Sequence, residues 1–214
     1  VIIVTATTEP SPTQPAASST PITPTPSPTP PGGSLLIEYT SNRDGNYEIY
    51  AMLGDGTVQT RVTNNPGADD TSPDLSADFT RTVFVSNRDG NLQIYAMNSN
   101  GTEQVRLTNN TFNDYSPGWS PDSTRIVFVS DRDGSAEVYV MNADGSGQTR
   151  LTTGNLENDN PSWSADGTRI AFDTINPTGR IIQIMAANGT AITDLTGPGS
   201  DNFDPAISPD GQRI

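Results

Sequence analysis

The sequence predicts an all-β fold, and three observations support this prediction. Short runs of β-branched and aromatic residues are bounded by Asp-Gly and Asn-Gly turns, which is the pattern of strands joined by tight hairpins. No stretch places apolar residues at helical spacing over more than two turns. From residue 35 onward, one pattern returns every 44 or 45 residues. A fixed period of this length indicates an array of similar structural units.

Several independent markers share this period. The turn sequence at 41–45 recurs at 86–90 and again at 130–134, with Asn replaced by Asp in the third copy. One proline and one aspartate in each unit are spaced by 44 residues; they are Pro73, Pro117, Pro161 and Pro205, and Asp78, Asp122, Asp166 and Asp210. Agreement between separate markers excludes a chance repetition of any one of them.

Each unit contains four short strands, which in the third unit are expected at 116–120, 125–129, 137–141 and 148–152. The turns between them are rich in Asp, Asn and Gly, which supply the side-chain acceptors and positive φ of tight hairpins. A four-stranded meander of this size cannot bury both its faces alone. Radial stacking of such sheets does bury them, so the array predicts a β-propeller of four-stranded antiparallel blades. A β-solenoid is the alternative, although its repeats are usually shorter.

The phase of the array bears on how the ring closes. It starts at the second strand of a unit, at 35–40, and ends just after a first strand, at 204–208. That first strand could pair with the second strand of the first unit and close a four-bladed ring. Because residues 213 and 214 begin a further second strand, we expect the four visible repeats at 35–214 to belong to a larger ring, incomplete at the C-terminus.

Residues 1–34 form a separate segment rich in Pro, Thr and Ser. Nine prolines fall between Pro10 and Pro31, and Glu9 is the only charged residue. Proline fixes φ and removes backbone donors, so neither helix nor sheet is expected. We predict a disordered, extended linker or stalk on the order of 90 Å long when fully in the polyproline II conformation. Such a stalk would serve as a membrane or cell-wall tether.

Composition excludes several classes of function. The net charge is −14, and phosphate groups would be repelled, so no nucleic-acid partner is expected. The sequence has no His and no Cys, which excludes a Ser-His-Asp triad, a His-ligated zinc and disulfides within this chain. No Gly-x-Ser-x-Gly nucleophile elbow is present either. The sequence therefore predicts a protein that is not itself an enzyme and needs no cofactor.

Acidic loops are the candidate ligand-binding region. In a propeller, the connections after the second and fourth strands open on the same mouth of the ring. The connections after the fourth strands carry Asp69, Asp70, Asn113, Asp114, Asn158, Asp159, Asp201 and Asn202. Their oxygens suit Ca²⁺, which takes six to eight oxygen ligands. Because no EF-hand pattern is present, we interpret them as solvated turn residues and predict no metal site.

Arginine and tryptophan also recur once per unit. Arg43, Arg88 and Arg132 each precede Asp-Gly. This regularity favours a structural role, in which Asp caps the turn and Arg pairs with Asp between blades. A ring of ligand contacts at the mouth is the alternative. Trp119 and Trp163 hold equivalent positions, where we expect them to pack between blades; exposure would instead indicate carbohydrate stacking.

The repeats resemble the WD-like propeller repeat of the TolB family over residues 35–214. The motif reads Pro-Ser-Trp-Ser-Ala-Asp-Gly at 161–167, Pro-Gly-Trp-Ser-Pro-Asp at 117–122 and Pro-Ala-Ile-Ser-Pro-Asp-Gly at 205–211. Leu75 and Ile207 stand where the motif has Trp, and the N-terminal α/β domain of the periplasmic TolB protein has no counterpart in this sequence. The resemblance implies a generic propeller in the periplasm or at the cell surface.

Two functions follow as hypotheses. The first is a non-enzymatic, extracytoplasmic binding or scaffold module that holds a protein, peptide or glycan at its mouth. The second is the substrate-gating propeller of a larger prolyl-oligopeptidase-like hydrolase, because similar propellers precede hydrolase domains in that family. A fold shared by many activities cannot choose between them.

Overall fold

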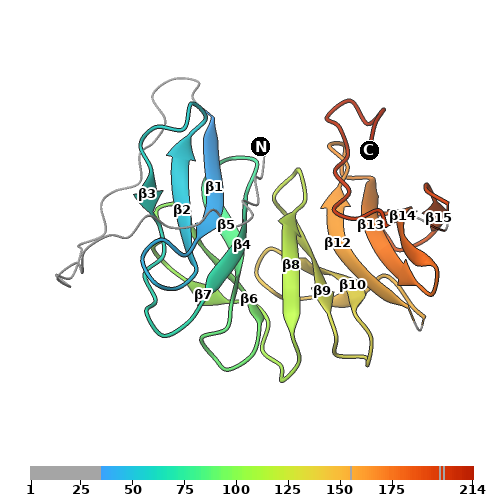
Figure 1. Ribbon diagram of the computed structural model, residues 1–214, viewed down its shortest axis with the longest axis horizontal. Coiled ribbons are helices and arrows are strands. Elements are labelled where there is room, and N and C mark those ends of the chain that lie inside the picture. Colours follow the sequence, from blue (N-terminus) through green and yellow to red (C-terminus); the bar gives the residue numbers. More distant parts are fainter. Residues whose placement is uncertain (1–34, 155, 198, 200) are drawn as a thin grey trace.

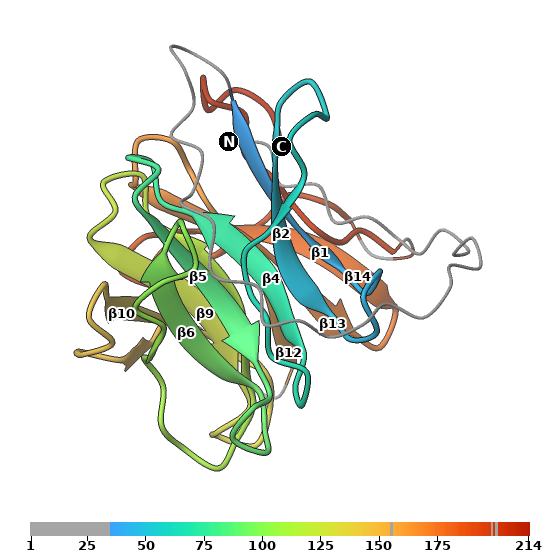
Figure 2. The same cartoon turned by 90° about the vertical axis from the view of Figure 1, so that its left-hand side faces the viewer.

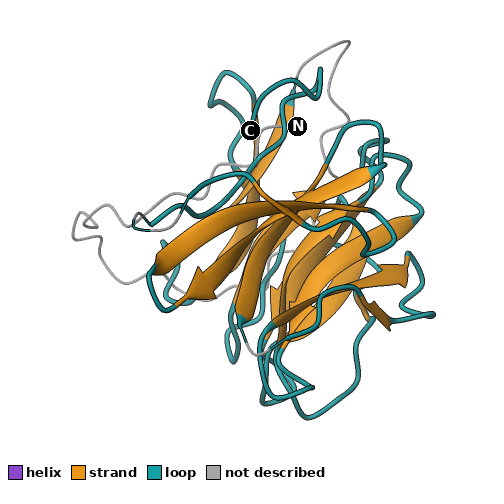
Figure 3. Cartoon of the chain, turned by 90° about the vertical axis from the view of Figure 1, so that its right-hand side faces the viewer, coloured by secondary structure: helices purple, strands orange, loops and turns teal. Residues whose placement is uncertain are grey.

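The computed structural model describes residues 35–154, 156–197, 199 and 201–214 (Figure 1). These residues form fifteen β-strands and no helix, as the secondary-structure colouring in Figure 3 shows. The predicted linker at 1–34 lies outside the described residues. No helix in the described part of the chain is long and apolar enough to cross a membrane.

The strands form four separate antiparallel sheets, which we call blades one to four. Blade one contains β1 (Leu36–Ser41), β2 (Glu48–Leu53) and β3 (Thr60–Arg61). Blade two contains β4 (Asp70–Leu75), β5 (Arg81–Ser86), β6 (Gln93–Asn98) and β7 (Val105–Arg106). Blade three contains β8 (Asp114–Trp119), β9 (Arg125–Ser130), β10 (Glu137–Asn142) and β11 (Thr149–Arg150). Blade four contains β12 (Glu157–Trp163), β13 (Arg169–Asn176), β14 (Gly179–Ala186) and β15 (Thr193–Asp194).

The predicted all-β propeller architecture is confirmed. The blades are arranged as an open fan around a common axis (Figures 1 and 2). The first strands of blades two, three and four face this axis, since β4 packs beside β8 and β8 beside β12. The fourth strands are only two residues long. In blade three, Leu151 and Thr152 both donate backbone hydrogen bonds to the carbonyl oxygen of Val138, which ends the regular ladder.

Each inner strand contains a bulge at the same place. The register between the first and second strands shifts between Thr71 and Asp74 in blade two, and equivalent shifts occur in blades three and four. One residue in each bulge has left-handed φ: 52° at Ser72, 50° at Ser116 and 50° at Asn160. A proline follows each of them, and this explains why the proline recurs: it stands where no ladder hydrogen bond is required.

The hydrophobic core lies between blades. One cluster joins Val83 and Ile94 of blade two to Trp119, Ile126 and Phe128 of blade three. A second cluster joins blade three to blade four in the same way, through Val127 and Val138 against Trp163 and Ile170. The two tryptophans therefore pack between blades, with 6% and 9% of their surface exposed. Neither is available as a stacking surface for sugars.

Ring closure and the hairpin of blade four differ from what the repeat pattern predicts. Residues 204–208 form no strand, and β1 pairs with β2 alone among the described residues, so the described segments do not close a ring by strand pairing. In blade four the Arg-Asp-Gly turn is missing. There β13 and β14 are eight residues each and meet in a tight hairpin at Asn176–Gly179, because Asn176 Oδ1 accepts the backbone N–H and hydroxyl of Thr178.

Candidate functional site

Strand direction places the candidate residues at one end of the fan. First strands run away from this end, second strands return to it, and the alternation continues through each meander. The loops after the second and fourth strands therefore share this end, which we call the mouth. The loops after the first and third strands share the opposite end. All eleven candidate residues belong to the mouth or to the strand ends below it.

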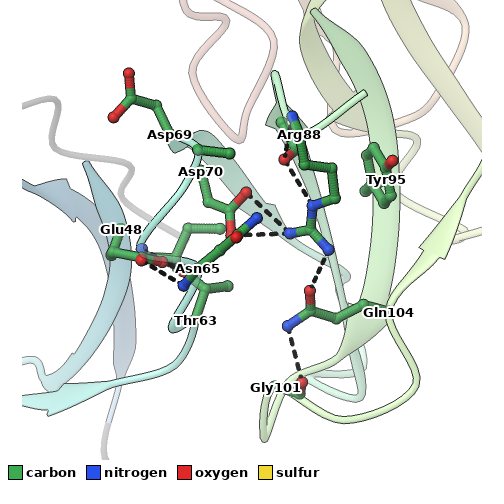
Figure 4. Close-up of polar contacts among 12 residues, drawn as sticks. Glu48, Thr63, Asn65, Asp69, Asp70, Arg88, Tyr95, Gly101 and Gln104 are labelled. Carbon is green, nitrogen blue, oxygen red and sulfur yellow. Dashed lines mark hydrogen bonds and ion pairs between the residues drawn. The ribbon is translucent and has the colours of Figure 1, made fainter. Parts of the chain in front are cut away.

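Arg88 is held by a complete set of intramolecular contacts (Figure 4). It lies 2.9 Å from both carboxylate oxygens of Asp70, which is fully buried at the start of β4. It also donates to Ser86 Oγ at 2.8 Å and to Gln104 Oε1 at 2.7 Å, and its guanidinium stacks 4.6 Å from the ring centre of Tyr95. Burial raises the pKa of Asp70, and the Arg88 contact opposes this shift.

Arg132 repeats the arrangement in blade three. It donates to Asp114 Oδ1 at 2.9 Å, to Ser130 Oγ at 2.7 Å and to Gln148 Oε1 at 2.7 Å. Its guanidinium lies 4.8 Å from the ring centre of Tyr139. The expectation that arginines pair with Asp between blades is wrong in this respect. Every ion pair given for the described residues joins two residues of one blade. In blades two and three, the Asp at the start of the first strand lies beside the turn that follows the second strand.

Arg43 differs because blade one lacks an inner strand in the described structure. Its guanidinium donates to Tyr39 Oη and Gln59 Oε1, both at 2.8 Å, and to Ser41 Oγ at 3.1 Å. It stacks 4.5 Å from the ring centre of Tyr50. No described carboxylate stands where Asp70 and Asp114 stand in the next blades, and the side chain is exposed. Arg43 is thus the one of the three that retains unpaired positive charge.

A second row of polar residues lies under the mouth and was missed by the sequence analysis. Glu48, Gln93 and Glu137 begin the third strands and are fully buried. Glu48 accepts hydrogen bonds from Thr63 Oγ1, the backbone N–H of Asn65 and Arg61 (Figure 4). Glu137 is held in the same way by Thr152, Arg150 and Asn158. The recurrence of a carboxylate or amide every 44 or 45 residues was the available signal.

The Asp of the Arg-Asp-Gly turn also has a partner that the sequence did not reveal. The hydroxyls of Tyr50, Tyr95 and Tyr139 donate to Asp44, Asp89 and Asp133, respectively.

Turn capping is instead performed by another repeated Asp: Asp122 Oδ1 accepts from Ser120 Oγ, the backbone N–H of Thr124 and its hydroxyl. These hydrogen bonds lower the pKa of Asp122, and the same happens at Asp78 and Asp166.

Asp69 and Asn113 tie neighbouring mouth loops together. Asp69 Oδ1 accepts the backbone N–H of Tyr47 at 3.0 Å, and its own N–H donates to Asn87 Oδ1 at 2.8 Å. Figure 4 shows the Asp69 carboxylate directed away from the pair formed by Arg88 and Asp70. Asn113 is bonded through its backbone and side chain to Asp131. Both residues stabilise the loops that form the rim of the mouth.

The remaining candidates lie around blade four. Asn158 is buried and bonded to Glu137 and Thr174. Asp159 is half-buried, accepts from Ser116 Oγ at 3.2 Å, and has its pKa raised by burial. Asp201 is exposed and accepts the backbone N–H of Arg180 at 3.1 Å, while the N–H of Asn202 donates to the carbonyl of Arg180 at 3.0 Å. The structure thus divides the eight acidic-loop residues between buried supports and a partly exposed rim.

The division into buried and partly exposed acidic residues bears on whether the mouth could bind Ca²⁺. Asp70 and Asp114 direct their carboxylates to Arg88 and Arg132. Over the residues with assigned positions, no group of three or more acidic side chains is placed to hold a metal ion. The contacts of these acidic residues order the loops of the mouth, and the described acids do not converge as the ligands of a Ca²⁺ ion would.

Exposed aromatic side chains accompany the acidic rim. Tyr47 in the first mouth loop is 40% exposed, and Phe112 beside Asn113 is 46% exposed. Exposed aromatic rings beside an acidic or amide side chain form a surface suited to protein or peptide contact. Below the rim, the inner strands line a cavity of about 510 Å³ along the axis, with Pro73, Pro117 and Pro161 on its wall.

Two carboxyl groups near this cavity, the buried Glu38 and the half-buried Asp74, have no acidic counterpart in the other repeats. Asp74 in β4 lines the cavity, and burial raises its pKa to about 7. Glu38 in β1 is 5% exposed and accepts from Thr82 Oγ1 at 2.9 Å, but its Oε2 has no hydrogen-bond partner among the described residues. Burial raises the pKa of Glu38 to about 8, and the charge of Asp74 adds to this shift. The residues equivalent to Glu38 in blades two, three and four are Val83, Val127 and Ala171.

Comparisons with known proteins agree with this geometry. A family model described as the TolB β-propeller domain matches residues 3–111 and 89–214. The structure of TolB from Acinetobacter baumannii superposes with a TM-score of 0.72 at 27% identity, covering 82% of this chain and 44% of that chain. A TolB structure from Agrobacterium tumefaciens gives a TM-score of 0.72 at 24% identity, covering 82% and 67%.

A hydrolase also shares the fold. The structure of puromycin hydrolase superposes with a TM-score of 0.62 at 15% identity, covering 76% of this chain and 28% of that chain. At this identity the likeness concerns the fold alone. A comparison with curated protein sequences gives no significant match.

Proposed function

The chain belongs to the TolB β-propeller domain family, and from this premise we propose that it is a non-enzymatic binding module that holds a protein or peptide partner at its mouth. The observation that carries the proposal is the composition of the rim, where exposed Tyr47 and Phe112 stand beside Asp69 and Asn113. Aromatic residues are enriched at protein interfaces, and a rim ordered by its own hydrogen bonds loses little entropy on binding.

The burial of both tryptophans favours a protein or peptide over a glycan. Trp119 and Trp163 are packed between blades and cannot stack on a sugar ring. The net charge of −14 favours a partner segment that carries positive charge. The ion pairs given for the described residues involve neither Asp69 nor Asp201, so these two rim acids can meet such a partner. The exposed acids of the turns after the second strands, Asp44, Asp89 and Asp133, are instead paired with arginines of the fourth strands.

We further propose an extracytoplasmic location, with residues 1–34 as the tether to a membrane or cell wall. The support is compositional: alternating Pro, Thr and Ser in this segment, together with membership of the TolB propeller family. Fractionation of cells that express the chain with its natural flanking sequence tests this location.

Site-specific photo-cross-linking tests the mouth. A benzophenone amino acid replaces Phe112 at the mouth in one variant and Phe79, 39% exposed in the loop after β4 at the opposite end, in the matched control. The proposal expects a discrete protein adduct in cells from position 112 and none from position 79. Equal labelling at both positions, or none at 112, would contradict a partner site at the mouth.

The second candidate is a propeller that filters substrates for a hydrolase domain. Its support is the fold shared with puromycin hydrolase. It predicts peptide-bond hydrolysis by a longer form of the protein that contains such a domain, with cleavage limited to short peptides. Under the binding hypothesis, no form of the protein hydrolyses peptides.

A further inference from the structure

The part of the mouth between blades three and four carries two exposed apolar side chains at equivalent positions of the repeat. Phe112 and Leu156 are 46% and 40% exposed. They lead into β8 and β12, the first strands of blades three and four, which pack side by side. The equivalent residue before β4 is Ala68, which is buried. Both blades are complete four-stranded sheets, so this surface lies between described elements.

Three carboxylates lie near enough to Tyr115, the second residue of β8, to act on its hydroxyl. Burial raises the pKa of Tyr115 to about 12, and the negative charges of Asp159, Asp131 and Glu157 add to this shift. Ser116 Oγ donates to Asp159 Oδ1 at 3.2 Å and thereby joins β8 to β12. The turn after β9 and the strand β12 thus bring acids from two blades to one tyrosine.

These three carboxylates have no cation of their own. None of them takes part in an ion pair given for the described residues. Glu157 is exposed, and Asp159 and Asp131 accept hydrogen bonds from neutral groups only. Arg180, a cation that opposes their effect on the tyrosine, is bonded to the buried Asp173 at 2.9 Å. The surface therefore keeps an excess of negative charge.

The repeat does not require this chemistry. Between blades two and three, the four positions equivalent to the tyrosine and the three acids hold neutral residues, namely Thr71, Asn87, Asn113 and Tyr115. Carboxylates with a structural role recur in both blades, as Asp70 and Asp114 do. A set of acids that one pair of neighbouring blades has and the next pair lacks indicates recognition at an exposed surface.

Arginines elsewhere in the molecule show which group complements a tyrosine beside carboxylates. Arg88 lies 2.9 Å from Asp70 and 4.6 Å from the ring centre of Tyr95. Arg132 repeats this arrangement in blade three. A planar guanidinium pairs with carboxylates and contacts an aromatic ring at the same time. The surface around Tyr115 offers both kinds of partner, and the arginine can come from another molecule.

We propose that this surface binds a peptide segment in which an arginine is flanked by apolar residues; the surface is formed by Phe112, Tyr115, Asp131, Leu156, Glu157 and Asp159. The guanidinium pairs with Glu157 and Asp159 beside Tyr115, and its apolar neighbours contact Phe112 and Leu156. Complementary charge selects arginine over neutral or acidic residues, and its planar donors engage two carboxylates better than the point charge of lysine does. This inference rests on the proposed function and specifies the chemistry of the partner.

Titration with two short peptides, followed by nuclear magnetic resonance of the isotope-labelled protein, tests the site. The probe is Gly-Leu-Arg-Leu-Gly, and its matched control carries citrulline, which keeps the shape of arginine without the charge. The proposal expects saturable shifts at the backbone amides of Tyr115, Glu157 and Asp159, with about tenfold higher affinity for the arginine peptide. Equal affinities, or no saturable shift at millimolar peptide, overturn the proposal.

Charge-neutral variants locate the binding. E157Q/D159N is expected to bind the arginine peptide about tenfold more weakly and to lose the preference over citrulline. The matched control, E103Q/D144N, removes the same charge from exposed residues at the end of the blades opposite the mouth. It retains its turn, because Asn100 holds the position equivalent to Asp144 in blade two, and it should keep the parent affinity. An equal loss in the control would show that net charge attracts the peptide, and this also overturns the proposal.

The photo-cross-linking experiment separates failure of this inference from failure of the proposed function. An adduct at position 112 in cells, together with equal affinity for the two peptides, would leave the binding function intact and overturn the arginine preference. Absence of both the adduct and peptide binding would contradict both. An adduct at position 112 that the E157Q/D159N background removes and the E103Q/D144N background retains would support both.

Discussion

The backbone N–H of Trp119 donates a 2.5 Å hydrogen bond to the half-buried carboxylate of Asp74, across the interface between blades two and three. The equivalents of Asp74 in the next units are Gly118, Ser162 and Ala206, so this contact exists at one interface only among the described blades. A carboxylate in this position links the stability of the interface to pH.

Asp74→Asn is expected to flatten the pH dependence of stability. In the folded protein the pKa of Asp74 is about 7, which exceeds the ordinary value for an aspartate. The folded state therefore retains a proton that the unfolded chain releases above pH about 4. Stability from this proton is complete at low pH and is lost as pH rises through 7, by at most about 1.4 kcal/mol per pH unit. Urea unfolding at pH 5 and pH 8 measures it. Parallel pH profiles for the variant and the parent would contradict the assignment.

Glu38→Val is expected to stabilise the protein at pH 8 by about 1–3 kcal/mol, because the buried carboxyl has an unpartnered oxygen and a raised pKa. Valine is the residue that blades two and three carry at this position. Glu38→Gln serves as the control, since it removes the charge but keeps a buried polar group, and should gain less. Chemical denaturation provides the readout; a loss of stability in the valine variant refutes the prediction.

Arg88→Ala is expected to cost about 3 kcal/mol, because it leaves the fully buried Asp70 without its cation. Arg132→Ala should behave alike through Asp114. Arg43→Ala is the matched control and should cost less than about 1 kcal/mol, since Arg43 is exposed and none of its hydrogen-bond partners is a carboxylate. Thermal or urea unfolding of the three variants compares them. Equal losses at all three positions would show that the buried carboxylates do not set the cost.

Arg125→Ala is expected to cost about 1 kcal/mol more than Arg169→Ala. Arg125 starts β9 and lies 4.7 Å from the ring centre of Trp163 in the next blade, and Arg81 lies 5.4 Å from that of Trp119. Arg169 holds the equivalent position, but Ile207 stands where the next Trp would be. Unfolding of the two variants under identical conditions decides the matter, and a larger loss for Arg169→Ala would exclude cation–π stacking as the cause.

Strand positions were predictable because their signals are local. In the third unit, strands expected at 125–129 and 137–141 are found at Arg125–Ser130 and Glu137–Asn142. The first strand begins two residues earlier than expected, at Asp114, because Asp114 and Tyr115 already pair with β9 ahead of the bulge at Ser116. The fourth strand is shorter because Leu151 and Thr152 share one acceptor. These differences arise from hydrogen-bond register, which the alternation of residues alone does not specify.

The candidate site was predictable in place but only partly in role. The period placed the acidic loops at one end of the fan, and once-per-unit arginines indicated a structural function. The partner of Arg88 could not be predicted, because Asp70 and Asp69 are adjacent in sequence. The register of β4, in which Asp70 pairs with Ser86, decides which carboxylate meets the guanidinium. Glu48 and Glu137 look like surface acids in the sequence but are buried under the mouth loops.

The sequence by itself determined the period, the four-stranded unit and its turns, since strand alternation, proline position and Asp-Gly turn chemistry act within a few residues along the chain. Tertiary structure decided which charges are buried and what they touch. Glu38 lies against Thr82, and Asp74 against Trp119, only because neighbouring blades pack face to face. The hydrogen-bond partners of these two carboxyl groups are residues a full repeat away, and the radial packing of blades brings them together.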